Sequence, residues 1–188
     1  MRRIVFMLGL AAAGFSGAAA AGCPPAPDHG AALAGLLEQA RRAGTEAEAQ
    51  RLVPDMWALW ADAPDDHAQA LLERGMTNRS GYNFLGALQA FDALIAYCPD
   101  YAEGYNQRAF VNYLRQDFSR ALPDLDRAVA LSPDHVAAIA GRALTLLALG
   151  RTGAARRDLD RALALNPWLP ERRLVAPGGP LAPEEHDI

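Results

Sequence analysis

Apolar residues recur along most of the chain at intervals of three and four positions, the period of an amphipathic helix. Ala121, Leu125, Ala128 and Leu131 share one predicted helix face, and the same pattern returns from residue 155 to residue 165. Gly150 then ends one predicted helix, and Thr152 is placed to cap the next. The chain is also rich in alanine and has only 7% aromatic residues, a composition that favours helices over a β-sandwich.

An internal repeat is the strongest pattern in the sequence. Pro99, Pro133 and Pro167 stand at equal intervals in similar settings, each preceded by a polar residue or cysteine. Serine and asparagine are typical helix N-caps, so Ser132 and Asn166 are predicted to cap helices that have the proline at the first position. Each unit between two prolines has room for two helices, so the sequence predicts an array of helical hairpins.

These features resemble the tetratricopeptide repeat, a 34-residue helix–turn–helix unit with an alanine, a large apolar residue four positions later, and a proline. The resemblance gives three repeats, at 68–101, 102–135 and 136–169. The tryptophan position of the family holds Leu71, Tyr105 and Ile139 here. The resemblance implies an all-α chain folded as a right-handed α-solenoid with an N-terminal helical cap. It implies little about the ligand, because one fold serves many functions.

The segments that flank the repeats have different predictions. Residues 28–64 are expected to form an N-terminal helical hairpin, either a degenerate repeat or an unrelated cap, with a capping box at Thr45-x-x-Glu48. Trp57 and Trp60 lie in its second helix, where they form the core of the cap or, in the alternative, a ligand platform. Residues 176–188 contain much proline and glycine, and a disordered tail is expected there.

The first residues have the composition of a signal peptide. Arg2 and Arg3 precede an apolar stretch, and small residues follow at a possible cleavage site, so residues 1–21 are predicted to direct export. The protein is then periplasmic or secreted. The sequence Ala20-Ala21-Gly22-Cys23 also resembles the lipobox of bacterial lipoproteins, and lipidation of Cys23 would make the protein a membrane-anchored lipoprotein instead.

Export places both cysteines of the chain, Cys23 and Cys98, in an oxidising compartment. Cys98 occupies the position that Ser132 and Asn166 hold in the other repeats, and a cysteine caps a helix poorly. We therefore expect a Cys23–Cys98 disulfide, which lipidation of Cys23 would exclude.

Candidate chemistry is sparse. The four histidines have neither the spacing of a zinc site nor a Cys-x-x-Cys companion, and the sequence contains no phosphate loop, dinucleotide fingerprint or hydrolase motif. The formal net charge of −4 disfavours nucleic acid as the main partner. We expect no metal, no cofactor and no enzymatic activity.

The resemblance also implies a ligand-binding groove lined by the first helix of each repeat. The implied groove residues are Leu72, Met76, Asn106, Phe110, Tyr113, Leu144 and Leu147, and Arg79 holds another of the family's ligand positions. Met76, Phe110 and Leu144 make the groove apolar, which suits a protein or peptide segment with an apolar face. The alternative is that the chain's own N-terminal helices or tail cover this surface. The expected function is a protein-interaction scaffold in the bacterial cell envelope, and the alternative is a lipid-anchored structural protein at an envelope membrane face.

Overall fold

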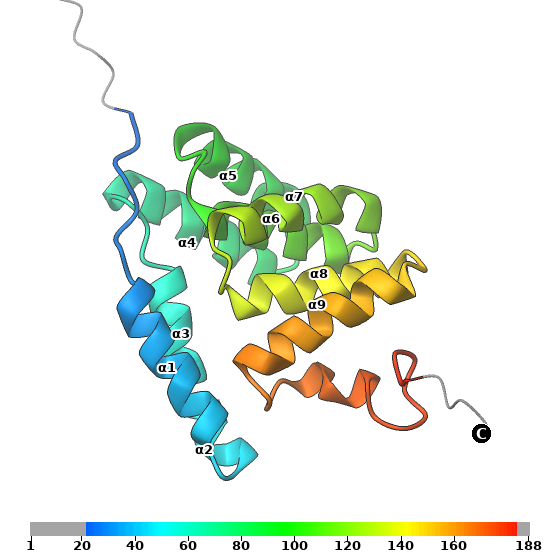
Figure 1. Cartoon of the computed structure of the whole chain (residues 1–188). Coiled ribbons are helices and arrows are strands. Elements are labelled where there is room, and N and C mark those ends of the chain that lie inside the picture. The colour runs from blue at the N-terminus through cyan, green and yellow to red at the C-terminus, as the bar shows by residue number, and fades with distance from the viewer. Residues whose placement is uncertain (1–21, 184–188) are drawn as a thin grey trace, which may run out of the picture.

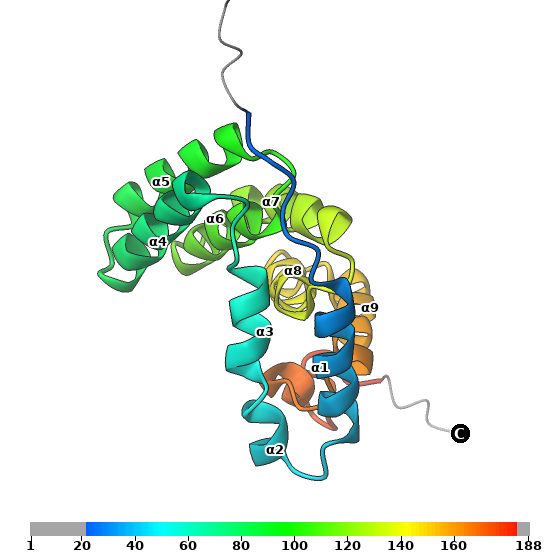
Figure 2. The ribbon, with the colours of Figure 1, turned by 90° about the vertical axis from the view of Figure 1, so that its left-hand side faces the viewer.

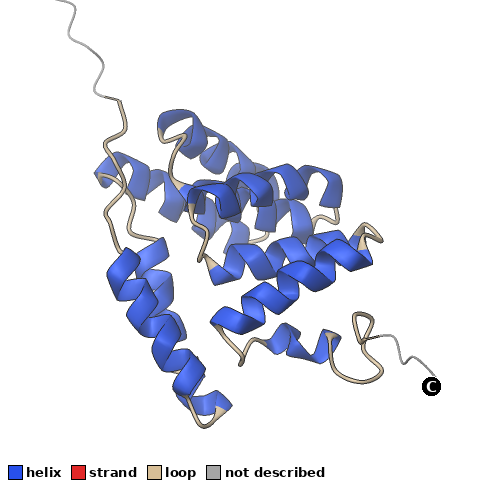
Figure 3. Cartoon of the chain, in the orientation of Figure 1, coloured by secondary structure: helices blue, strands red, loops and turns tan. Residues whose placement is uncertain are grey.

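The computed structural model describes residues 22–183, and its regular elements are all helical, with no strand in that range (Figures 1 and 3). The elements in chain order are α1 (Gly30–Arg42), α2 (Glu46–Gln50), α3 (Val53–Trp60), α4 (Asp66–Ser80), α5 (Phe84–Tyr97), α6 (Ala102–Leu114), α7 (Phe118–Leu131), α8 (Val136–Ala148), α9 (Thr152–Leu165) and the 3-10 helix η1 (Pro170–Leu174). The predicted signal peptide, residues 1–21, lies outside the described residues.

Three helical pairs form a solenoid, α4 with α5, α6 with α7, and α8 with α9, and each pair stacks on the next (Figure 1). Helices α6 and α8 begin at residues 102 and 136, which are the predicted starts of the second and third repeats. Ala87, Ala121 and Ala155 have no exposed surface, because these small residues let neighbouring helices approach closely. The all-α fold of paired helices is therefore confirmed.

The turn inside each repeat has a left-handed residue at the same position. Tyr82, Gln116 and Gly150 occupy this position in the three repeats and have φ angles of 59°, 60° and 72°. A side chain is unfavourable in this conformation, yet only the third repeat uses glycine there. Three different residue types thus adopt the same conformation, so the position in the repeat sets the turn conformation more strongly than the residue type does.

The residues before the regularly spaced prolines do not cap the following helices, contrary to the prediction. Cys98, Ser132 and Asn166 end the preceding helices, and their backbone N–H groups donate to the carbonyls of Leu94, Ala128 and Ala162. The N-cap prediction is wrong because a proline commonly follows a helix that it cannot continue. Helix α8 is capped later, by the His135 imidazole.

The N-terminal hairpin consists of α1, the short helix α2 and α3, with α1 and α3 side by side (Figure 2). The second helix of the hairpin is divided into α2 and α3 by a break just before Pro54. At its start the Thr45 hydroxyl accepts a hydrogen bond from the Glu48 N–H, as the capping box predicts. Leu33, Leu37 and Met56 share a core cluster with residues of α8 and α9. The hairpin thus folds against the third repeat and does not stack on α4 as a further repeat.

The C-terminal segment packs on the last repeat. Leu181 is 4% exposed and belongs to a core cluster with Leu146 and Leu159. Its N–H donates to the Leu174 carbonyl, and its own carbonyl accepts from Arg156 at 2.6 Å. The prediction of disorder is therefore wrong for residues 176–183, where a turn at Gly178 (φ 79°) folds the chain back onto α9. Residues 184–188 lie outside the described range.

A disulfide joins Cys23 to Cys98, with a Cα–Cα distance of 5.1 Å. It fixes the segment that precedes α1 to the end of α5. Among the helices of residues 22–183, none is long and apolar enough to cross a membrane.

Candidate functional site: a covered cavity in the solenoid

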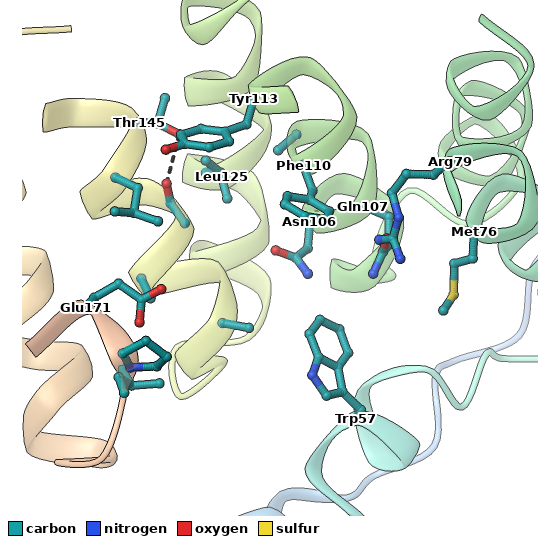
Figure 4. Close-up of a pocket in the computed structure, with 17 residues that line it drawn as sticks. Trp57, Met76, Arg79, Asn106, Gln107, Phe110, Tyr113, Leu125, Thr145 and Glu171 are labelled. Atoms are coloured by element: carbon teal, nitrogen blue, oxygen red, sulfur yellow. Dashed lines mark hydrogen bonds between the residues drawn. The ribbon is translucent and has the colours of Figure 1, made fainter. Parts of the chain in front are cut away.

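A cavity of about 500 Å³ lies against the first helices of the repeats, α4, α6 and α8 (Figure 4). Trp57 of α3 covers one side of it, and residues 169–171 cover another. Its full lining comprises Trp57, Met76, Arg79, Asn106, Gln107, Ala109, Phe110, Tyr113, Leu125, Ala137, Ala140, Gly141, Leu144, Thr145, Leu169, Pro170 and Glu171. The volume lies in the usual range of ligand pockets.

The wall of the cavity is mainly apolar. Met76, Phe110 and Leu144 occupy the same position in the three repeats, so the repeat places them at equivalent points on three neighbouring helices. Phe110 is 44% exposed, which is high for a phenylalanine in a folded chain. The side chains therefore offer an apolar surface that the chain itself does not fully cover.

Five of the predicted groove residues line this cavity, namely Met76, Asn106, Phe110, Tyr113 and Leu144. Leu72 does not, because it is completely buried in the core that includes Phe91 and Leu94. Leu147 does not either, since it packs on the core between α8 and α9. Their equivalents in the second repeat, Asn106 and Tyr113, do line the cavity, so the register is right, but in the first and third repeats the side chains are taken up by core clusters.

The N-terminal hairpin and the C-terminal segment cover part of the predicted groove, so the groove is not fully open. The N-terminal hairpin and the C-terminal segment meet through an ion pair between Glu46 Oε2 and Arg172 Nη2 at 2.9 Å. Trp57 and Glu171 extend from these two covers into the lining of the cavity. The open groove of a repeat array is thereby reduced to a bounded pocket.

A buried polar network lies beside the cavity. The Glu103 carboxylate is 1% exposed and accepts hydrogen bonds from Asn106 Nδ2 at 3.0 Å and from Gln107 Nε2. It also accepts from His135 Nε2 at 2.8 Å. Because His135 Nδ1 accepts the Ala138 N–H, the ring proton lies on Nε2. Three donors thus satisfy this buried carboxylate, as burial of a charge requires.

The same histidine holds the N-terminal hairpin. The Trp60 ring stacks on the His135 ring, with 4.3 Å between centroids and 9° between planes. The Trp57 ring meets Trp60 edge to face at 5.4 Å. The Tyr101 hydroxyl donates to the Trp60 carbonyl at 2.7 Å, and burial raises the pKa of Tyr101 well above its usual value. Of the two tryptophans, Trp60 is core and Trp57 lines the cavity.

Arg79 brings a positive charge to the cavity wall. Its guanidinium donates to Gln107 Oε1 and lies over the Phe110 ring, with 5.0 Å from Cζ to the ring centroid. Partial burial lowers the pKa of Arg79, and the nearby Glu103 carboxylate acts in the opposite direction.

Sequence reasoning missed several lining residues. Two of them have a signal in the sequence. Gln107 lies four positions after Glu103, on the same side of the helix, and Leu125 belongs to the apolar face of its own helix. Pro170 and Glu171 carry no such signal, since only the folded chain brings this segment to the cavity. In residues 22–183, no group of three metal-ligating side chains comes together. The cavity can bind an apolar group beside the Arg79 guanidinium.

Comparisons with known proteins agree with the helical array. The sequence model of the tetratricopeptide repeat family matches residues 113–177. This part of the chain is similar to tetratricopeptide repeats. This match covers the second half of one repeat and all of the next, together with the segment that follows them. A comparison with curated proteins finds no match.

Several solved tetratricopeptide structures are similar. The first tetratricopeptide domain of human RPAP3 is 25% identical, with 53% of this chain and 79% of that chain covered and a TM-score of 0.52. The same figures hold for the first such domain of RPAP3 bound to the HSP90 peptide SRMEEVD. A domain of yeast Sti1 in a complex with an Hsp70 peptide is 24% identical, covers 54% of this chain and 81% of that chain, and has a TM-score of 0.52, which supports the fold alone.

Proposed function

We propose that the chain is a protein-interaction module that holds a short apolar segment of a partner protein in the covered cavity. The observation that carries this proposal is the row formed by Met76, Phe110 and Leu144 on three successive repeats, with Phe110 substantially exposed. An apolar side chain that enters the cavity gains free energy by leaving water. The proposal assigns binding to the chain and no catalysis.

Similar domains support a peptide ligand. The first tetratricopeptide domain of RPAP3 is 25% identical to this chain and binds an HSP90 peptide. The cavity here is bounded by Trp57 and by residues 169–171, so it accommodates a few side chains of a segment and does not accommodate a long one. The proposed ligand is therefore short.

We further propose that the protein is exported and acts in the bacterial cell envelope or outside the cell. Two observations support this location, the apolar stretch after Arg2 and Arg3 and the Cys23–Cys98 disulfide. Disulfides persist mainly in oxidising compartments. The disulfide occupies the Cys23 thiol, so the structure gives no support to the lipid-anchored alternative.

Phe110→Glu tests the proposed function. A charged group in the apolar wall should weaken partner binding at least tenfold, because desolvating the carboxylate costs free energy. Far-UV circular dichroism and the melting temperature should stay near wild type, since Phe110 is 44% exposed and outside the core. Binding is measured by cross-linking from a photoreactive residue at position 144 in the native organism.

Leu85→Glu is the matched control, because Leu85 is 70% exposed and does not line the cavity. If the Phe110→Glu variant remains folded and still captures the partner as the wild type does, the cavity is not the binding site.

A further inference from the structure

Two charged side chains without an ionic partner in residues 22–183 lie on opposite sides of the cavity, Arg79 on α4 and Glu171 in η1 (Figure 4). Both are half-buried. Between them Figure 4 shows Phe110 and Leu125, together with the Asn106 amide that Glu103 holds. The cavity therefore has a positive end, an apolar middle and a negative end.

Arg79 differs from Arg108 and Arg142, two partly buried arginines of the later repeats. Arg108 and Arg142 each contact two aspartates, one in their own repeat and one in the repeat before. Arg79 has no carboxylate oxygen within 4.0 Å in residues 22–183, and its one hydrogen-bond acceptor there is the neutral Gln107 amide. Glu103 attracts Arg79 from the far side of Gln107, but it makes no direct ion pair with the guanidinium.

Glu171 has no ionic partner in the described part of the chain either. Its neighbour Arg172 is paired with Glu46 of the N-terminal hairpin, and within residues 22–183 the Glu171 carboxylate takes part in no ion pair or side-chain hydrogen bond. Fixing Arg172 in this way holds η1 against the cavity, and Glu171 remains in the lining.

We propose that the cavity selects a segment that carries an acidic side chain at the Arg79 end, apolar side chains in the middle and a basic side chain at the Glu171 end. This inference rests on the proposed function and specifies its ligand. A half-buried charge without a direct ion pair has already lost part of its hydration, so an opposite charge on the ligand can add a charge-assisted hydrogen bond to it. The apolar middle disfavours charge there. The two ends therefore also fix the direction in which the segment lies.

A displayed library of random nonapeptides, selected on the oxidised wild-type chain, is the first test. We expect enriched peptides with an acid and a base on opposite sides of an apolar centre, always in the same order. A synthetic peptide of the enriched sequence is then compared by fluorescence anisotropy with two altered versions. One has its acid replaced by the amide, and the other has its base replaced by glutamine.

Each altered peptide should bind the wild-type chain about tenfold more weakly, the effect of one charge-assisted contact. The loss from removing the acid should vanish in Arg79→Gln, and the loss from removing the base should vanish in Glu171→Gln. The control variants Arg74→Gln and Arg173→Gln, both at exposed positions outside the cavity, should behave as wild type.

The outcomes separate the two proposals. Enriched peptides that bind in the cavity without a charge requirement, or whose charge effects persist in Arg79→Gln and Glu171→Gln, overturn this inference and leave the proposed function standing. A library that yields no binder, or binders that Phe110→Glu does not affect, overturns the proposed function and this inference with it.

Discussion

At the scale of single residues, the two helices of each repeat meet at equivalent positions. The first repeat has Gly75 opposite Phe91, whereas the second and third repeats have alanine and leucine at the same positions. A Cβ atom added at Gly75 would overlap the Phe91 ring, and both residues are buried. The glycine thus makes room for an aromatic ring that is larger than the leucine of the other repeats.

Gly75→Ala should therefore lower the free energy of unfolding by about 1–3 kcal/mol, the usual cost of overpacking, despite the higher helix propensity of alanine. The double variant Gly75→Ala/Phe91→Leu should recover much of this loss, because it recreates the pair found in the other two repeats. Urea denaturation measures both effects.

Gly35→Ala serves as the control for helix propensity, since a Cβ atom there meets nothing within 4 Å. It should stabilise the chain by about 0.5–1 kcal/mol. A Gly75→Ala variant as stable as the wild type would mean that α4 and α5 are less tightly packed than the structure shows.

At the scale of elements, the sequence predicts what depends on local spacing and misses what depends on distant contacts. The period of the repeat locates α6 and α8 to the residue, because each repeat contacts mainly its neighbours. It cannot locate the docking of the N-terminal hairpin, because Trp60 contacts His135, which lies at the end of the second repeat. The N-cap prediction for the residues before the prolines failed for a different reason. A polar residue followed by proline is found both where a helix ends and where one begins.

Trp60→Ala should detach the hairpin from the repeats. Trp60 is 8% exposed and stacks on His135, so its removal should cost about 3–5 kcal/mol, as for other buried aromatic residues. Hydrogen exchange should become faster in α1 and α3 while α6 and α7 stay protected. Because Trp57 belongs to the same helix, the cavity should also open on that side.

Trp168→Ala is the comparison, since Trp168 is half-buried and lies after α9, away from the hairpin's contact with His135. Faster exchange spread evenly over all helices in Trp60→Ala would show that the hairpin is an inseparable part of the core.

At the scale of the whole molecule, two long-range connections add to the packing that holds the covers of the cavity. Glu46 and Arg172 join the N-terminal hairpin to η1, but side chains that are 45% and 34% exposed form an ion pair of at most about 1 kcal/mol. The Cys23–Cys98 disulfide is the stronger connection. The cavity could be predicted in part, through the repeat positions of Met76, Phe110 and Leu144. Its covers could not, because they depend on packing between segments that are distant in the sequence.

The disulfide should contribute most of the stability that these two connections give. It closes a loop across 75 positions, which restricts the unfolded chain and, on the chain-entropy model, is worth about 4 kcal/mol. Reduction should lower the urea midpoint accordingly, and the variant Cys23→Ser/Cys98→Ala should match the reduced wild type and show no response to reductant. Intact mass after alkylation, without prior reduction, checks the bridge itself. Two alkylated thiols in the folded protein purified from the periplasm, or a lipid adduct on Cys23, would contradict it.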